Sequence, residues 1–261
     1  MTPREFESLR SQGYNRIPVV REVLADLDTP LSVYLKLVDG PFGFLFESVH
    51  GGEKWGRYSI IGLPCRTILR INGDSVTISV DGEVVEQHES ADPLAFIEAF
   101  QARFRVPELP QLPRFSGGLV GYFGYDTVAY IETRLRNAAK PDPLGCPDIL
   151  LMLSEELVVF DNLSGRMYLI THADLDQGDD LASMQARLDA LIAKMQRGAP
   201  RHRPEVRREV SEADFISGFT EQGFKQAVDR IKRYILDGDC MQVVISQRLS
   251  IPFAARPLDL Y

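Results

Sequence analysis

The stretch Arg66–His88, RTILRINGDSVTISVDGEVVEQH, decides the fold class. Three short runs rich in β-branched residues are separated by the turn signals NGD and DG. These connections are too short for the crossovers that parallel strands require, so the runs predict consecutive antiparallel strands. Two further strand-like runs, FGFLFESV and RYSIIGL, precede them. The sequence therefore predicts an antiparallel meander over residues 41–88.

Helical patterns and further strands surround this meander. Thr2 and Asp92 are expected helix caps, each followed by a short helical run. Strands are predicted for ILLMLS, ELVVFD, RMYLIT and, near the end, the long run MQVVISQRLSIPF. Helices are predicted for residues 181–195 and 224–235, and Gly238 stops the second one. Because strands come in groups, we expect an α+β fold of layered antiparallel sheets flanked by helices.

A basic, proline-containing stretch, RGAPRHRPEVRREV, separates two helical patterns. Its charges are interrupted by Pro and Glu, which is typical of a solvated linker and not of a binding patch. We therefore expect a first domain over residues 1–196, a linker over 197–216 and the start of a second domain over 217–261. The sequence ends at RPLDLY, where Pro257 resembles the first position of a helix, so we expect a longer natural chain.

Composition and charge exclude several classes of partner. Lys and Arg total 29 against 37 Asp and Glu, and the formal net charge of −8 repels nucleic acid and anionic membranes. No apolar run approaches the ~20 residues of a membrane span, and the N-terminus lacks a signal-peptide pattern. Cys65, Cys146 and Cys240 are far apart and lack metal-ligand spacing. We expect a cytoplasmic protein without nucleic-acid or membrane partners and without a zinc site.

A carboxylate and a hydroxyl, Glu47 and Ser48, stand at the end of the run GFLFES. Both faces of this run are apolar, so we expect the strand to lie between two layers and Glu47 to need a cation. Two interpretations stay open. The cation is an internal partner such as Lys54 or Arg57, or it is the ammonium of an amino-acid ligand. In the second case Arg57 binds the ligand carboxylate, and the phenylalanines of the run line an apolar slot.

The stretch SGGLVGYFGYD, Ser116–Asp126, places four glycines around a short strand, which indicates close backbone approach. It lacks the GK[ST] and GxGxxG spacings of phosphate-binding loops. Together with LFES at 45–48 and GDCMQVVISQR at 238–248, in this order and spacing, it resembles anthranilate synthase component I. The resemblance covers essentially the whole chain. The glycine stretch and GDCMQVVISQR are also found in the wider chorismate-utilising family.

The resemblance implies an activity and a regulatory site. The family converts chorismate and ammonia to anthranilate and pyruvate, using Mg²⁺, in the first step of tryptophan biosynthesis. A glutamine amidotransferase subunit, component II, supplies the ammonia, and L-tryptophan inhibits the enzyme. Glu47 and Ser48 would hold the ammonium end of tryptophan, and Arg57 stands where a basic residue follows them. Domain 1–196 would be regulatory, and 217–261 would begin the chorismate-binding catalytic domain.

Gln242 is the candidate catalytic residue of this chain. Related enzymes that add water to chorismate carry a lysine at this position, whereas an amide cannot act as a general base. A purely structural role, capping a strand, is the alternative. The resemblance implies that the Mg²⁺ ligands and the main catalytic residues lie further along a longer chain, so we expect this one to be inactive alone. Aminodeoxychorismate synthase component I and a non-catalytic amino-acid-binding module stay open as other functions.

Overall fold

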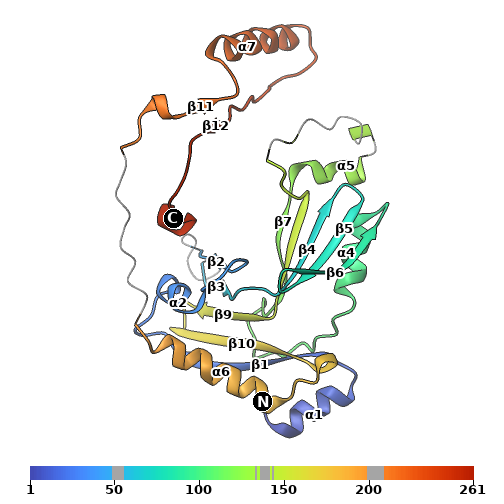
Figure 1. The fold of residues 1–261 in the computed structure, drawn as a ribbon, viewed down its shortest axis with the longest axis vertical. Helices are drawn as coiled ribbons and strands as arrows, with labels where there is room; N and C mark the ends of the chain where they lie inside the picture. The colour runs from blue at the N-terminus through green and yellow to red at the C-terminus, as the bar shows by residue number, and fades with distance from the viewer. Residues whose placement is uncertain (49–55, 133, 136–141, 143, 199–208) are drawn as a thin grey trace. The chain divides into compact units, whose positions relative to one another are not determined.

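The computed structural model describes residues 1–48, 56–132, 134–135, 142, 144–198 and 209–261 (Figure 1). The chain divides into two compact units, Met1–Pro200 and Arg201–Tyr261. Two five-stranded antiparallel sheets make up most of the first unit, which confirms the predicted α+β fold of layered antiparallel sheets with flanking helices. The regulatory and catalytic roles of the two predicted domains stay predictions.

The first sheet has the strand order β1-β10-β9-β3-β2. Its strands are β1 (Arg16–Leu24), β2 (Phe44–Phe46), β3 (Tyr58–Gly62), β9 (Glu156–Asp161) and β10 (Arg166–Asp174). Three helices pack on one face of it, α1 (Pro3–Ser11), α2 (Pro30–Leu37) and α6 (Leu181–Met195) (Figure 1). Each helix buries apolar side chains in the core against this sheet, among them Phe6, Val33 and Leu188. This burial of apolar side chains explains why the helices form on this face.

The second sheet has the order β6-β5-β4-β8-β7. Its strands are β4 (Thr67–Asn72), β5 (Ser75–Val80), β6 (Glu83–Glu89), β7 (Gly118–Phe123) and β8 (Ile149–Ser154). The helix α4 (Pro93–Gln101) buries Ile97 and Phe100 against β4, β5 and β8. A short 3₁₀ turn, η1 (Tyr125–Thr127), and α5 (Val128–Ile131) follow β7.

The two sheets meet at a corner, because β3 of the first sheet leads into β4 of the second, and β8 of the second leads into β9 of the first. β3 pairs with β9 in the first sheet, and β4 pairs with β8 in the second. Where the chains cross, the Leu63 N–H donates to the Glu156 carbonyl at 3.0 Å. The predicted single meander over 41–88 is therefore wrong, because β2 and β3 belong to one sheet and only β4–β6 form a meander in the other. Short connections do not reveal this division, since pairing with the distant strands β8 and β9 decides it.

Local capping signals place the helices correctly. Thr2 Oγ1 accepts from the Glu5 N–H at 3.3 Å, and Asp92 Oδ1 caps α4, so both predicted helix starts are confirmed. Neither β1 nor α2 was predicted from the sequence. The signal for α2 was present, because Thr29 Oγ1 accepts from the Ser32 N–H at 3.1 Å and a proline follows Thr29, as in α1.

The glycines of β7 allow the close backbone approach that the sequence predicted. A Cβ on Gly121 would lie 1.9 Å from the Leu150 carbonyl oxygen of the neighbouring strand. Gly117 has φ +142°, and a Cβ there would lie 2.5 Å from His172 Cε1. A larger residue at Gly121 would require the neighbouring strand to move, and one at Gly117 would require the His172 ring to move.

The second unit is described over residues 209–261 and contains one long element there, α7 (Glu221–Leu236). This helix and its stop at Gly238, φ +83°, confirm the prediction. Shorter elements are η4 (Glu212–Asp214), β11 (Ile216–Ser217), β12 (Leu249–Ser250) and α8 (Pro257–Leu260).

The predicted long strand MQVVISQRLSIPF is wrong, because only the two residues of β12 form a strand and 242–248 has no regular structure. A strand needs partners for its backbone groups, and among the described residues β12 pairs with the two-residue β11. None of the helices in the described part of the chain has the length and apolar character to cross a membrane.

Candidate functional site

Glu47 and Ser48 follow β2 at the edge of the first sheet. Phe46 pairs with Ile60, and this antiparallel register directs the residues after β2 toward the residues that precede β3. The Glu47 side chain is half-buried, whereas Ser48 is exposed. The expected burial on both faces is wrong in part, because β2 is an edge strand and Phe46 is 51% exposed. The strand is also shorter than the predicted run, since it ends one residue before Glu47.

The two phenylalanines of β2 have different surroundings. Phe44 is buried, and its ring covers Gly62 on β3, where a Cβ would lie 1.9 Å from Phe44 Cε1. The ring centroids of Phe44 and Phe46 are 4.9 Å apart. Phe44 therefore belongs to the core, and of the two rings only Phe46 can offer apolar surface to a ligand.

Arg57 lies just before β3 and forms a two-pronged ion pair with Asp161 at the end of β9. Arg57 Nε and Nη2 donate to Asp161 Oδ1 and Oδ2 at 2.9 and 2.6 Å. The Arg57 side chain is 40% exposed, whereas Asp161 is 2% exposed. The hydrogen bonds from Arg57 hold the pKa of the Asp161 carboxyl at about 2, and the same carboxylate raises the pKa of Arg57. Two internal cations were considered as partners of Glu47. Arg57 forms its ion pair with Asp161, and Lys54 lies outside the described residues.

The turn after β9 also holds the backbone around Arg57. The Asn162 N–H donates to the Arg57 carbonyl at 2.8 Å, and Asn162 Nδ2 donates to Ser59 Oγ at 3.2 Å. Asp161 Oδ1 accepts from the Leu163 N–H at 3.2 Å as well. The Tyr58 ring lies beside the guanidinium of Arg57, with its centroid 4.9 Å from Cζ. The position of Arg57 is thus fixed at both its backbone and its side chain.

Neither Asp161 nor Asn162 was predicted as a site residue. The signal was available, because Asp161 ends the apolar run ELVVFD just as Glu47 ends its own run. A second buried carboxylate at a strand end implies a second cation, and Arg57 was the basic residue already under consideration.

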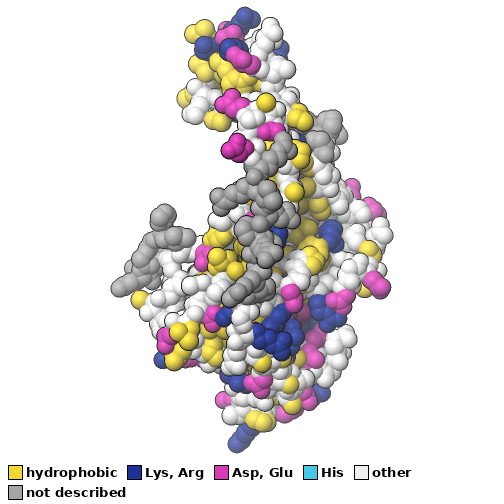
Figure 2. Space-filling view, turned by 60° about the vertical axis from the view of Figure 1, so that its left-hand side comes forward, with side chains coloured by type: hydrophobic (Ala, Val, Ile, Leu, Met, Phe, Trp, Pro, Cys, Tyr) yellow, Lys and Arg dark blue, Asp and Glu magenta, His cyan; other side chains and the backbone are white. Residues whose placement is uncertain are grey.

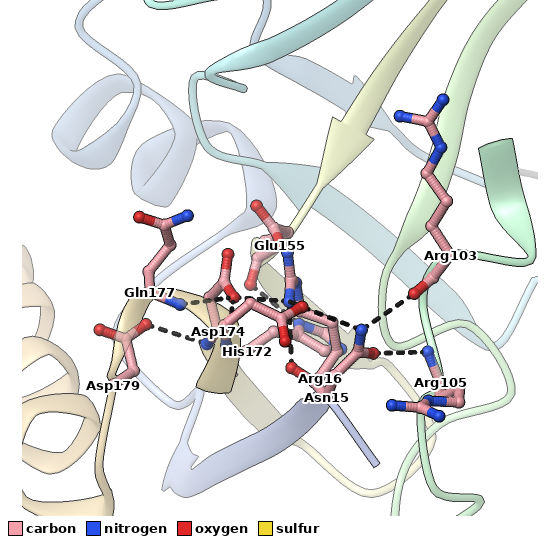
Figure 3. A network of polar contacts seen from close by, with 10 residues as sticks. Asn15, Arg16, Arg103, Arg105, Glu155, His172, Asp174, Gln177 and Asp179 are labelled. Atoms are coloured by element: carbon pink, nitrogen blue, oxygen red, sulfur yellow. Dashed lines mark hydrogen bonds and ion pairs between the residues drawn. The ribbon is translucent and has the colours of Figure 1, made fainter. Parts of the chain in front are cut away.

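A separate polar network lies at the corner between the two sheets, beside a cleft of about 760 Å³ (Figure 3). Arg16 donates to Glu155 at 3.0 Å and forms an ion pair with Asp174 at 2.6 Å. Asn15 Nδ2 donates to the Arg103 carbonyl, and Figure 3 shows the Arg103 side chain pointing away from the network. Burial raises the pKa of Glu155 although Arg16 opposes this effect.

The groups of this network satisfy one another. His172 Nδ1 lies 2.9 Å from the Glu155 carbonyl, and burial lowers the pKa of the imidazole. Arg187 forks onto Glu156 at 2.6 Å. Acidic and basic side chains also lie side by side over the surface of the first unit (Figure 2). The network therefore joins the sheets to the segment after α4, and its Arg16 is shared by the carboxylates of Glu155, Asp174 and Asp176.

Gln242 lies in the second unit, is exposed and belongs to no strand. Its neighbour Gln247 is the glutamine that stabilises the small β11–β12 ladder, because Gln247 Nε2 donates to Ser217 Oγ at 2.7 Å. The described residues contain no group of three or more His, Cys, Asp or Glu side chains placed to hold a metal ion.

Comparison with known proteins identifies the family. Residues 49–261 match the family described as chorismate binding enzyme. The chain belongs to this family. Among curated chorismate binding enzymes, anthranilate synthase component 1 of Pseudomonas aeruginosa is 55% identical over 263 residues, covering 100% of this chain and 54% of the relative. The corresponding protein of Neisseria gonorrhoeae is 51% identical, covering 100% of this chain and 53% of its own.

A solved structure shares the fold of this chain. The crystal structure of anthranilate synthase component I from Streptococcus pneumoniae matches with a TM-score of 0.60 at 22% identity. The match covers 91% of this chain and 50% of the solved one. The chain thus spans about half the length of the curated relatives that it matches.

Proposed function

We propose that this chain is part of the large subunit of an anthranilate synthase. The enzyme converts chorismate and ammonia to anthranilate and pyruvate in the first step of tryptophan biosynthesis. The observation that carries this proposal is 55% identity over the whole chain to a protein named anthranilate synthase component 1. A glutamine amidotransferase subunit, component II, would supply the ammonia. The cytoplasm, where thiols stay reduced, suits the free Cys65, Cys146 and Cys240.

Glu47, Ser48 and Arg57 form the proposed tryptophan-binding site of the first unit. The register of β2 and β3, which directs Glu47 and Ser48 toward the chain before Tyr58, supports this grouping. A carboxylate and a hydroxyl can bind the ammonium of a zwitterion, and a guanidinium can fork onto its carboxylate. Phe46 offers exposed aromatic surface next to these groups for the indole ring.

Gln242 is the proposed catalytic residue of the second unit. An amide has no useful proton affinity at neutral pH, so the nucleophile must already be neutral and reactive when it arrives. Ammonia meets this condition and water does not. Magnesium is the expected cofactor of the whole enzyme and would neutralise the carboxylates of chorismate.

Product analysis tests the reaction. The natural gene product that contains this chain is incubated with chorismate, Mg²⁺ and ammonium, and products are separated and identified by mass. We expect anthranilate and an equal amount of pyruvate. Accumulation of aminodeoxychorismate would assign the protein to the other branch of the family. Tight binding of an amino acid without any turnover would favour a non-catalytic module.

Inhibition by L-tryptophan tests the site. Glu47→Gln and Ser48→Ala are each expected to raise the inhibition constant, Glu47→Gln by about 10- to 100-fold, because it removes a charged hydrogen bond. Glu83→Gln is the matched control, since Glu83 is an exposed acid on β6 in the other sheet. Unchanged inhibition in both site variants would contradict the assignment of the site.

A further inference from the structure

Arg57 has two edges that can bind a carboxylate, and the structure uses one of them. The bonds to Asp161 involve Nε and Nη2, so the Nη1 hydrogens take no part in this ion pair. A planar guanidinium with five N–H donors can hold one carboxylate along its Nε–Nη2 edge and another along its Nη1–Nη2 edge. Since the Arg57 side chain is 40% exposed, a ligand can reach it.

Contacts in two directions fix the plane of this guanidinium. Asp161 holds it edge-on, and the Tyr58 ring lies 4.9 Å from Cζ. Asp161 is itself immobile, because it is 2% exposed and also accepts from the Leu163 N–H. An arginine side chain that is ordered before binding loses less conformational freedom when the ligand arrives.

We propose that Asp161 is a positioning residue for the amino-acid site: it orients Arg57 so that its outer edge meets the carboxylate of the ligand. The inference rests on the proposed tryptophan site and deepens it. It also gives the site a selectivity, because only ligands that carry a carboxylate benefit from an oriented Arg57. An indole amine without a carboxylate, such as tryptamine, gains nothing from Asp161.

The experiment compares inhibition by L-tryptophan and by tryptamine in the complete natural protein. Asp161→Asn removes the charge and keeps an oxygen that can accept from the turn. The inhibition constant for tryptophan is expected to rise about 3- to 10-fold, because binding must then also order the Arg57 side chain and lose its conformational entropy. The inhibition constant for tryptamine should not change. Each value is referred to the uninhibited rate of the same variant.

Asp81→Asn is the matched control. Asp81 receives the same two-pronged contact from Arg66, at 2.9 and 2.6 Å, but in the second sheet. Its removal should change neither inhibition constant. Arg57→Lys is made in parallel, since it removes the fork and leaves Asp161 a cation even if Asp161→Asn fails to fold. We expect Arg57→Lys to weaken inhibition by tryptophan and to spare tryptamine.

Three results would overturn the inference. The first is unchanged tryptophan inhibition in Asp161→Asn or in Arg57→Lys. The second is an equal loss for tryptophan and tryptamine, which would mean that Asp161 supports the fold of the site in general. The third is a wild-type protein that tryptophan does not inhibit, a result that would remove the proposed tryptophan site as well. The wild-type measurement therefore separates failure of the site from failure of the positioning role.

Discussion

Replacing Asp161 by asparagine should cost stability by an amount that the structure allows us to work out. The carboxyl is 2% exposed, and its pKa falls from the ordinary value of 3.8 to about 2, chiefly because Arg57 donates to it. A fall of this size corresponds to roughly 2 kcal/mol in favour of the ionised form. Arg57 is 40% exposed, so solvent screens part of this energy. We expect Asp161→Asn to lower the free energy of unfolding by about 1–2 kcal/mol at pH 7.

The pH dependence gives this prediction its sign. Because the pKa of Asp161 is lower in the folded protein than in the unfolded chain, its contribution is fully present above the unfolded value of 3.8. The contribution is lost as the pH falls through the folded value of about 2. The difference between wild type and Asp161→Asn should therefore shrink to about half at pH 3.

Urea denaturation followed by circular dichroism, at pH 7 and pH 3, measures both values. Urea is chosen because it leaves ion pairs unscreened, unlike guanidinium chloride. Asp81→Asn should lower stability less than Asp161→Asn, because both partners of that ion pair are mostly exposed. A stability difference for Asp161→Asn that is the same at pH 7 and pH 3 would refute the electrostatic reasoning.

Three further substitutions or treatments test other parts of the first unit. Gly121→Ala should destabilise it by at least ~2 kcal/mol in the same denaturation assay, because the new Cβ would meet the Leu150 carbonyl oxygen at 1.9 Å. Asn15→Ala should speed proteolytic cleavage in the segment after α4, since Asn15 Oδ1 and Nδ2 hold its backbone. Iodoacetamide at pH 8 should label the exposed Cys146 much faster than Cys65, because burial raises the pKa of Cys65 to about 11, as mass spectrometry of labelled peptides can show.

Features that depend on neighbouring residues were predictable from the sequence. Thr2 and Asp92 begin helices because their side chains accept from backbone N–H groups three residues later. Gly238 ends α7 because a left-handed residue is required there. The strands β4, β5 and β6 were predictable because the turn signals NGD and DG lie between them.

Features that depend on distant residues were not predictable in the same way. The apolar run before Glu47 reads as a buried strand, but its place at the sheet edge exposes Phe46. Arg57, one of the two cations considered for Glu47, is paired with Asp161, which lies on a strand far along the chain. Alternation and turn signals describe single strands, whereas partners and sheet edges depend on which strands meet in space.

The corner shared by the two sheets has a consequence for how the chain is made. β1 pairs with β10, β3 with β9 and β4 with β8, so the earliest strands wait for residues that leave the ribosome much later. Pairings between segments so distant in the sequence form slowly. The first sheet cannot close before Asp174 has been synthesised, nor the second before Ser154, and until then the nascent strands have open edges. The first unit can therefore complete its fold only after most of its residues have been synthesised.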